Sequence, residues 1–138
     1  SVETGLPLSA DENGPLREDL QKIAAALWEK GVENVIITLG GSGSAVVRED
    51  GIHYISSVHM DHVADPTAAG DSFVGALSVG LTVGLSQDEA LAFASHTAAI
   101  TVSRMGAMPS LPTLAEVQTL LKERGYRGFD SAALDILK

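Results

Sequence analysis

Residues 35–43 read Val-Ile-Ile-Thr-Leu-Gly-Gly-Ser-Gly, a short apolar run that ends in a glycine-rich turn. β-Branched residues favour a strand, and an almost continuous apolar run is typical of a strand covered on both faces, as in a parallel sheet. The glycines alone fit either a tight turn after a strand or a loop that approaches a ligand. They match neither the Gly-x-Gly-x-x-Gly fingerprint nor a Walker A loop, which requires Gly-Lys-Ser/Thr.

The sequence on either side of this run predicts a helix and two strands. Residues 45–47 and 52–55 are rich in β-forming residues, and the Asp-Gly pair between them predicts a hairpin turn. Before the run, apolar residues recur at helical spacing between Pro15 and Gly31, two residues that suit the beginning and the end of a helix. Residues 58–63 fit either one more short strand or an extended approach to the next loop.

The C-terminal half predicts mainly helices. Residues 71–84 carry small apolar side chains and almost no charge, so we expect a buried helix there. Two capping boxes, at residues 86–89 and 113–116, mark the beginnings of two more helices. Residues 130–137 predict a last helical turn. Several helices with few strands indicate an α/β layered domain whose visible sheet is part of a larger one.

Composition and charge exclude several classes of function. A length of 138 residues with 45% hydrophobic content fits one globular domain. Nine basic residues against eighteen acidic ones give a net charge of −9, so we expect no nucleic-acid partner. The absence of cysteine excludes disulfides, zinc–thiolate sites and thiol catalysis, and it fits a reducing, cytoplasmic location. Without a long apolar run or a signal-type N-terminus, we expect no membrane partner.

Residues 65–73 read Asp-Pro-Thr-Ala-Ala-Gly-Asp-Ser-Phe, a small-residue loop that enters the helix expected over 71–84. Small side chains let a ligand approach the backbone, and the first N–H groups of a helix lack internal partners. Together with the helix dipole they make an anion site that needs no basic side chain. Asp71 is then either a base for a hydroxyl that attacks a bound phosphate, or only a first-turn acidic residue that complements the dipole.

Three segments together resemble the ribokinase-like, or PfkB-type, family of carbohydrate kinases. Residues 65–73 are similar to the family's Asp-Thr-x-Gly/Ala-Ala-Gly-Asp signature, with Pro66 in place of threonine. Residues 35–43 resemble the family's strand and glycine loop at the nucleotide, and residues 98–110 resemble a helix end and loop of ribokinase. Pro66 removes one N–H group, but the implied anion hole lies further along the chain, so we expect the change to be tolerated.

The resemblance implies a three-layer α/β/α, Rossmann-like fold, of which residues 1–138 are the C-terminal, nucleotide-binding portion. The N-terminal part and the lid of the family, which carry most of its sugar-binding residues, have no counterpart here. We therefore expect an incomplete sheet and an isolated chain without activity. The family's Asn-x-x-Glu motif, which helps to place Mg2+, is not assigned, because residues 2–5 are either its remnant or the residues after it.

The activity implied by the resemblance is phosphoryl transfer from ATP to a sugar hydroxymethyl group, by an enzyme that is a homodimer at full length. Asp71 would be the catalytic base, and the N–H groups of Ala68, Ala69, Gly70 and Asp71 would form the anion hole. The implied nucleotide contacts are Thr38, Leu39, Gly40, Gly41, Ser42, Gly43 and Gly70, with Ser95 or His96 near the adenine. A nucleoside, fructose or a keto-deoxy sugar acid stays open as the acceptor of the phosphoryl group. A second alternative is that the chain is a fragment that binds a nucleotide without catalysis.

The resemblance also implies a monovalent cation, K+, beside the anion hole. Its ligand positions correspond to Asp65, Thr67, Thr101, Arg104, Gly106 and Ser110, mostly through backbone carbonyl groups. The cation would order the loop that forms the anion hole and so act on catalysis indirectly. A metal pair at His59 and His62 is a weaker hypothesis, because alternation in a strand sends residues three apart to opposite faces.

Overall fold

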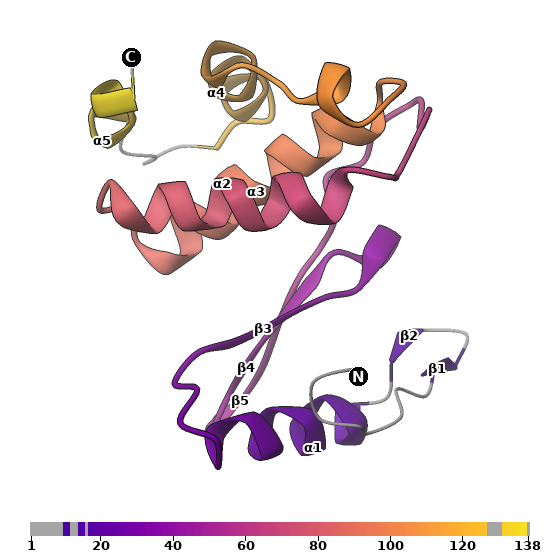
Figure 1. Cartoon of the computed structure of the whole chain (residues 1–138), viewed down its shortest axis with the longest axis vertical. Helices are drawn as coiled ribbons and strands as arrows, with labels where there is room; N and C mark the ends of the chain where they lie inside the picture. Colours follow the sequence, from indigo (N-terminus) through magenta and orange to yellow (C-terminus); the bar gives the residue numbers. More distant parts are fainter. Residues whose placement is uncertain (1–9, 12–13, 16, 127–130, 138) are drawn as a thin grey trace. The chain divides into compact units, whose positions relative to one another are not determined.

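The computed structural model describes residues 10–11, 14–15, 17–126 and 131–137 of the chain. The chain divides into two compact units, residues 1–57 and residues 58–138 (Figure 1). Residues 2–5, where the magnesium motif is not assigned, lie outside the described residues.

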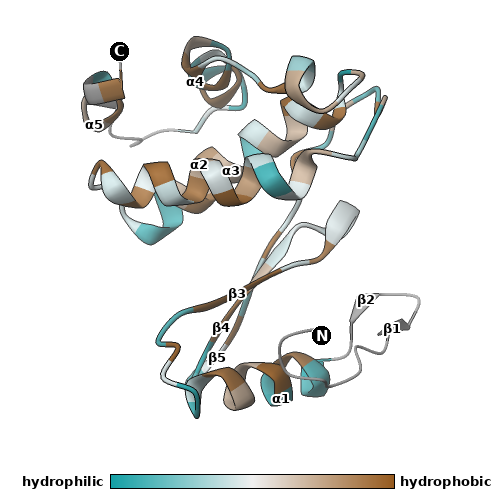
Figure 2. Cartoon of the chain, viewed as in Figure 1, coloured by the Kyte–Doolittle hydropathy of each residue, from teal (hydrophilic) through white to brown (hydrophobic). Residues whose placement is uncertain are grey.

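The first unit is a small sheet covered by one helix. Its sheet has the order β3-β4-β5 with antiparallel pairing throughout, and a separate pair of short strands, β1 and β2, is also antiparallel. The helix α1 packs against the sheet through Leu20 and Ala24, which are buried with Val35, Ala45 and Val47. Figure 2 shows hydrophobic residues along the strands and a mixture of hydrophobic and hydrophilic residues on α1. The elements are β1 (Ala10–Asp11), β2 (Gly14–Pro15), α1 (Arg17–Trp28), β3 (Val35–Thr38), η1 (Gly40–Ser42), β4 (Ser44–Arg48) and β5 (Gly51–Ile55).

The central strand β4, rather than β3, is buried along its length. Residues 44–47 are all buried, whereas burial in β3 decreases from Val35 to the exposed Thr38. The reason is position, because β4 has a paired strand on each side and β3 has one only on the β4 side among the described strands. The parallel neighbour that the apolar run favours is not present among them, which agrees with a sheet that is only partly contained in this chain.

The predicted helix and hairpin of this unit are both confirmed. The helix begins at Arg17 rather than Pro15, because Pro15 pairs with Ala10 in the β1–β2 ladder. It ends at Trp28, and Gly31 closes the turn that follows, as expected: it has φ +87° and donates its N–H to the carbonyl of Trp28 at 2.9 Å. In the hairpin, Arg48 lies opposite Gly51, so the turn is residues 49–50, one residue earlier than the expected Asp50-Gly51 pair, and Gly51 is the first residue of β5.

The second unit is helical. Its two long helices, α2 and α3, are joined by a short turn and lie side by side (Figure 1). Their close approach depends on Gly80, where an added Cβ would lie 3.2 Å from the Cβ of Ala90. Both predicted capping boxes are present, at Ser86–Glu89 and Thr113–Glu116. The elements are α2 (Ala69–Thr82), α3 (Gln87–Val102), η2 (Met108–Ser110), α4 (Leu114–Glu123), α5 (Ser131–Leu134) and η3 (Asp135–Leu137).

The buried helix of this unit is α3, not α2. Most side chains of α3 are buried, whereas α2 leaves Val74 and Leu81 exposed by 57% and 46%. The expectation of a buried helix over 71–84 is therefore wrong for the unit taken by itself, because the exposed side of α2 carries Val74 and Leu81. Residues 58–63 form no strand. None of the helices in the described part of the chain is long and apolar enough to cross a membrane.

Candidate active site

Asp65 ties together two loops of the second unit that are far apart in sequence. Its Oδ1 accepts hydrogen bonds from the N–H and the hydroxyl of Thr67, at 2.9 and 2.5 Å, and its Oδ2 accepts one from the N–H of Gly106 at 3.2 Å. The N–H groups of Ala64 and Asp65 both donate to the carbonyl of Val102, at 2.7 and 3.1 Å. The loop that enters α2 is therefore fastened to the end of α3 and to the loop that follows it.

These hydrogen bonds also determine the charge of Asp65. The pKa of the Asp65 carboxyl is held below its usual value mainly by the hydrogen bonds from the hydroxyl and the N–H of Thr67, and next by the bond from Gly106. Burial has a smaller effect and raises the pKa. All three hydrogen bonds are donated to the ionised form, so Asp65 stays a carboxylate near neutral pH.

The N-terminus of α2 presents unused N–H groups. Ala68 precedes the helix without a side-chain cap, and the N–H of Ala69 donates to the carbonyl of Pro66 at 3.1 Å. Within the described residues, the N–H groups of Gly70 and Asp71 have no acceptor. Pro66 thus contributes to the turn through its carbonyl, so its missing N–H is not needed here. The positive end of the helix dipole and these N–H groups together suit an anion.

Asp71 lies in the first turn of the same helix and is exposed. It borders a mainly apolar pocket of about 360 Å³ between α2, α3 and the beginning of α4, whose lining includes Val79, Phe93 and Leu111. Ser72 is not an alternative base, because its hydroxyl is buried and donates to the carbonyl of Ala69 at 3.0 Å. Asp71 is the exposed carboxylate of this turn, beside the unused N–H groups.

The structure brings some of the six expected cation positions together. Asp65, Thr67 and Gly106 are joined by the hydrogen bonds of the Asp65 carboxylate. Thr101 and Arg104 are adjacent at the end of α3, where the N–H of Arg104 donates to the carbonyl of Thr101 at 3.2 Å. The donors at these positions are carboxylate, hydroxyl and carbonyl oxygens, which fit a hard cation such as K+ rather than a thiophilic metal.

The sixth position, Ser110, lies in η2 and is buried. Its hydroxyl donates to the carbonyl of Ala107 at 2.6 Å, which leaves the lone pairs of the oxygen for another donor or a cation.

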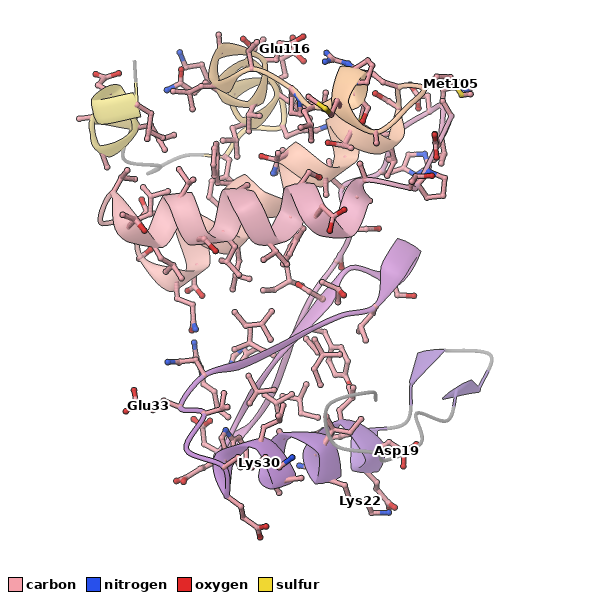
Figure 3. The ribbon with its side chains drawn as sticks, in the orientation of Figure 1. Asp19, Lys22, Lys30, Glu33, Met105 and Glu116 are labelled. Atoms are coloured by element: carbon pink, nitrogen blue, oxygen red, sulfur yellow. The ribbon has the colours of Figure 1, made fainter. Side chains whose placement is uncertain are left out.

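The side chain of Arg104 makes a contact that the sequence did not predict. It donates to Oε1 of Glu116 at 2.5 Å, while Oε2 of Glu116 accepts from the N–H and the hydroxyl of Thr113, at 2.7 and 2.9 Å. The bond from Arg104, followed by those from Thr113, lowers the pKa of Glu116 to about 2. Glu116 projects from the beginning of α4 (Figure 3). Its capping role was visible in the sequence, but nothing in the sequence indicated a partner twelve residues earlier.

The glycine loop of the first unit is closed by its own backbone. The N–H of Leu39 donates to the carbonyl of Gly43 at 2.8 Å, and Gly40 and Gly43 have φ values of +58° and +101°. The hydroxyl of Ser57 donates to the carbonyl of Gly41 at 2.6 Å. Ser57 is a residue that sequence reasoning missed, and it holds this loop against the end of β5.

The two expected adenine contacts differ in accessibility. His96 is only 6% exposed, its Nδ1 is 2.7 Å from the carbonyl of Ala92, and its ring packs edge-on against Tyr126 at 6.2 Å. Burial lowers the pKa of His96. Ser95 is only partly buried. Of the two side chains, Ser95 is the one that a ligand can reach.

Residues 6–114, which include parts of both units, match the family model described as pfkB family carbohydrate kinase. The chain belongs to the pfkB family of carbohydrate kinases. Two curated relatives are close in sequence. A ribokinase of Schizosaccharomyces pombe is 36% identical over 116 residues, which is 83% of this chain and 36% of that protein. Probable fructokinase-4 of Arabidopsis thaliana is 39% identical over 106 residues, covering 72% of this chain and 32% of that protein.

A solved structure of the pfkB family shares the fold. The structure of Arabidopsis thaliana ribokinase complexed with ribose and ATP is 30% identical and superposes with a TM-score of 0.66, covering 77% of this chain and 39% of that one. The predicted family and the α/β fold class are thus confirmed. The chain spans about a third of the length of the relatives that it matches.

Proposed function

We propose that the chain is the C-terminal, nucleotide-binding portion of an ATP-dependent sugar kinase, which transfers the γ-phosphoryl group of ATP to a sugar hydroxymethyl group. The observation that carries this proposal is the uncapped beginning of α2, where unused N–H groups of Gly70 and Asp71 accompany the exposed Asp71 carboxylate. Membership of the pfkB family supports the type of reaction. The ribose and ATP in the Arabidopsis ribokinase complex support the choice of substrates.

In the proposed mechanism, Asp71 takes the proton of the sugar hydroxyl as the oxygen attacks the γ-phosphorus. The new O–P bond forms while the bond from the γ-phosphorus to the bridging oxygen of the β-phosphate breaks, which gives a sugar phosphate and ADP. The N–H groups of Gly70 and Asp71 and the dipole of α2 stabilise the charge on the transferring group. Ala69 contributes less than its neighbours, because its N–H already donates to Pro66.

The nucleotide is proposed to lie along residues 38–43. The backbone bonds within this loop and the bond from Ser57 hold its shape before ATP arrives, so little conformational entropy is lost on binding. Ser95 is proposed to face the adenine, since His96 is buried against Tyr126.

Two cations are expected to accompany ATP. Bound with the nucleotide, Mg2+ supplies charge neutralisation on the phosphates. Among the side chains that the structure describes, no group of three or more His, Asp or Glu could hold a metal ion, so we assign none of them to Mg2+. The oxygen donors at Asp65 and Ser110, with the carbonyl groups of residues 101–106, are proposed to hold K+.

Ribose is the first candidate for the acceptor and fructose the second. The ribokinase relatives favour ribose, and the Arabidopsis fructokinase, at 39% identity, is the specific observation that favours fructose. A coupled ADP-release assay of the whole kinase with ribose, fructose and a nucleoside distinguishes these acceptors.

The decisive test compares two first-turn helix carboxylates, Asp71 and Asp88. We expect Asp71→Asn to lower kcat by about 10²–10⁴-fold, as is usual for a lost general base, with ATP affinity nearly unchanged. The control Asp88→Asn removes a carboxylate that only complements the dipole of α3, so activity should stay near wild type. Equal and small effects of the two substitutions would overturn the role of Asp71.

A further inference from the structure

Hydrogen bonds on either side of residues 104–106 link the beginning of α4, through the backbone of this short segment, to the loop before α2. Glu116 holds Thr113 with one carboxylate oxygen and Arg104 with the other. Two residues after Arg104, the N–H of Gly106 donates to Asp65. Asp65 in turn holds Thr67, directly before the uncapped helix end.

The short segment between Arg104 and Gly106 is held at both of its ends. At one end Arg104 is fixed by its side chain to Glu116 and by its N–H to the carbonyl of Thr101. At the other end Gly106, with φ +86°, is fixed by Asp65. The residue between them, Met105, is 71% exposed, so its packing adds little to the order of the segment (Figure 3). Arg104 and Asp65 therefore hold the backbone of this segment at both of its ends.

Both groups of the Arg104–Glu116 pair are partly exposed, with side-chain exposures of 35% and 42%. Such a pair adds little to the stability of a fold. Its geometric effect is larger than its energetic one, because an arginine guanidinium keeps a defined orientation on a carboxylate. Glu116 is itself held by two bonds from Thr113, so it offers Arg104 a fixed rather than a mobile partner.

We propose that Glu116 is a positioning residue of the cation site: by holding Arg104 it fixes residues 104–106, and so it sets the affinity for K+ without touching the ion or the substrates. The proposal rests on the proposed kinase function and its cation site. It assigns to a helix-capping glutamate a second task, which is to hold the backbone of the neighbouring loop in place.

The test uses the whole kinase with three substitutions. Glu116→Gln and Arg104→Gln each break the ion pair, and Arg104→Gln leaves the capping box of α4 intact. Glu89→Gln is the matched control, because Glu89 occupies the same position in the capping box of α3. The first readout is the K+ concentration that gives half-maximal activity, measured against Na+ at constant ionic strength. The second needs no turnover and is the increase in melting temperature on replacing NaCl with KCl.

We expect wild type to prefer K+ over Na+ in both readouts. Glu116→Gln and Arg104→Gln should each raise the half-maximal K+ concentration about three- to fivefold, in line with a partly exposed ion pair. The double variant should match either single variant, because both remove the same contact. Glu89→Gln should lower the melting temperature in both salts alike and leave the K+ response unchanged.

The outcomes separate this proposal from the proposed function. A wild-type enzyme that phosphorylates no sugar refutes the function, while the K+-dependent melting shift still tests the positioning role. An active enzyme in which both ion-pair variants respond to K+ as wild type does, or in which Glu89→Gln changes the response equally, overturns the role of Glu116. If Glu116→Gln does not fold, Arg104→Gln alone decides.

Discussion

The carboxylate of Asp65 accepts a hydrogen bond at 3.2 Å from the N–H of Gly106, which lies 41 residues further along the chain. This is the bond that joins the loop before α2 to the loop after α3. Because the other oxygen of the same carboxylate holds Thr67, one side chain determines the position of the backbone in both of these loops.

Replacement of Asp65 by asparagine should therefore impair phosphoryl transfer more than ATP binding. An amide has one accepting oxygen in place of two, so it cannot satisfy Thr67 and Gly106 at once. We expect kcat to fall about tenfold or more, since a displaced oxyanion donor costs about 10²–10³-fold when lost completely. Steady-state kinetics would measure this, with the exposed neighbour Asp61→Asn as the control. A normal kcat in Asp65→Asn would contradict the bridging role.

The glycine loop offers a sharper comparison, between Gly43 and Gly41. A Cβ at Gly43 would collide with backbone atoms of Ile55 and Ser57, and its φ of +101° disfavours any other residue. A Cβ at Gly41 would meet nothing within 4 Å. We expect Gly43→Ala to raise the KM for ATP and to cost about 1–3 kcal/mol in stability, the usual range for a strained backbone. Gly41→Ala should change the free energy of unfolding by less than about 0.5 kcal/mol, as substitutions at unconstrained surface sites do. Equal effects in chemical denaturation would show that the loop is not held at Gly43.

His96 predicts a dependence of stability on pH. Burial lowers its pKa, so the folded chain keeps the ring neutral at a pH where the unfolded chain protonates it. The unfolded state then binds more protons, and the stability that is fully present above about pH 6.5 is lost as the pH falls toward the folded pKa. The urea midpoint should be lower at about pH 5.5 than at about pH 7.5, and less so in His96→Gln than in the exposed control His62→Gln. The same decrease in both variants would assign the effect to other groups.

A polypeptide of these 138 residues alone should self-associate. Among the described strands β3 is paired on one side only, and the exposed side of α2 carries Val74 and Leu81. An unpaired strand edge and bare apolar surface both favour association. Sedimentation velocity should show oligomers whose size increases with concentration. A monomer with a cooperative, high-temperature melt would refute this expectation.

Local signals in the sequence were sufficient for much of the fold. The closing turn of α1 at Gly31, the β4–β5 hairpin and both capping boxes each depend on a few neighbouring residues, so pattern and spacing predicted them, with the hairpin turn displaced by one residue. The burial of β4 rather than β3 was not predictable in this way, because it depends on which strand is central in the sheet.

For the candidate site, sequence predicted the residues but not the contacts between them. The small-residue loop and Asp71 follow from the motif, whereas the bonds from Arg104 to Glu116 and from Ser57 to Gly41 link positions that no periodicity relates. The burial of His96 was likewise missed, since a histidine on a helix gives no indication of which side faces Tyr126.

The long sequence separation of the Asp65–Gly106 bond has a consequence for the order of folding. The bonds of the capping boxes close over three residues and can form as soon as α3 and α4 begin, whereas the bond of Asp65 must wait for a 41-residue loop to close. We therefore expect the helices to gain protection from hydrogen exchange before the Gly106 amide does. A chain can then have a native circular-dichroism spectrum and still lack the assembled anion hole, so recovery of catalysis on refolding should lag behind recovery of helix.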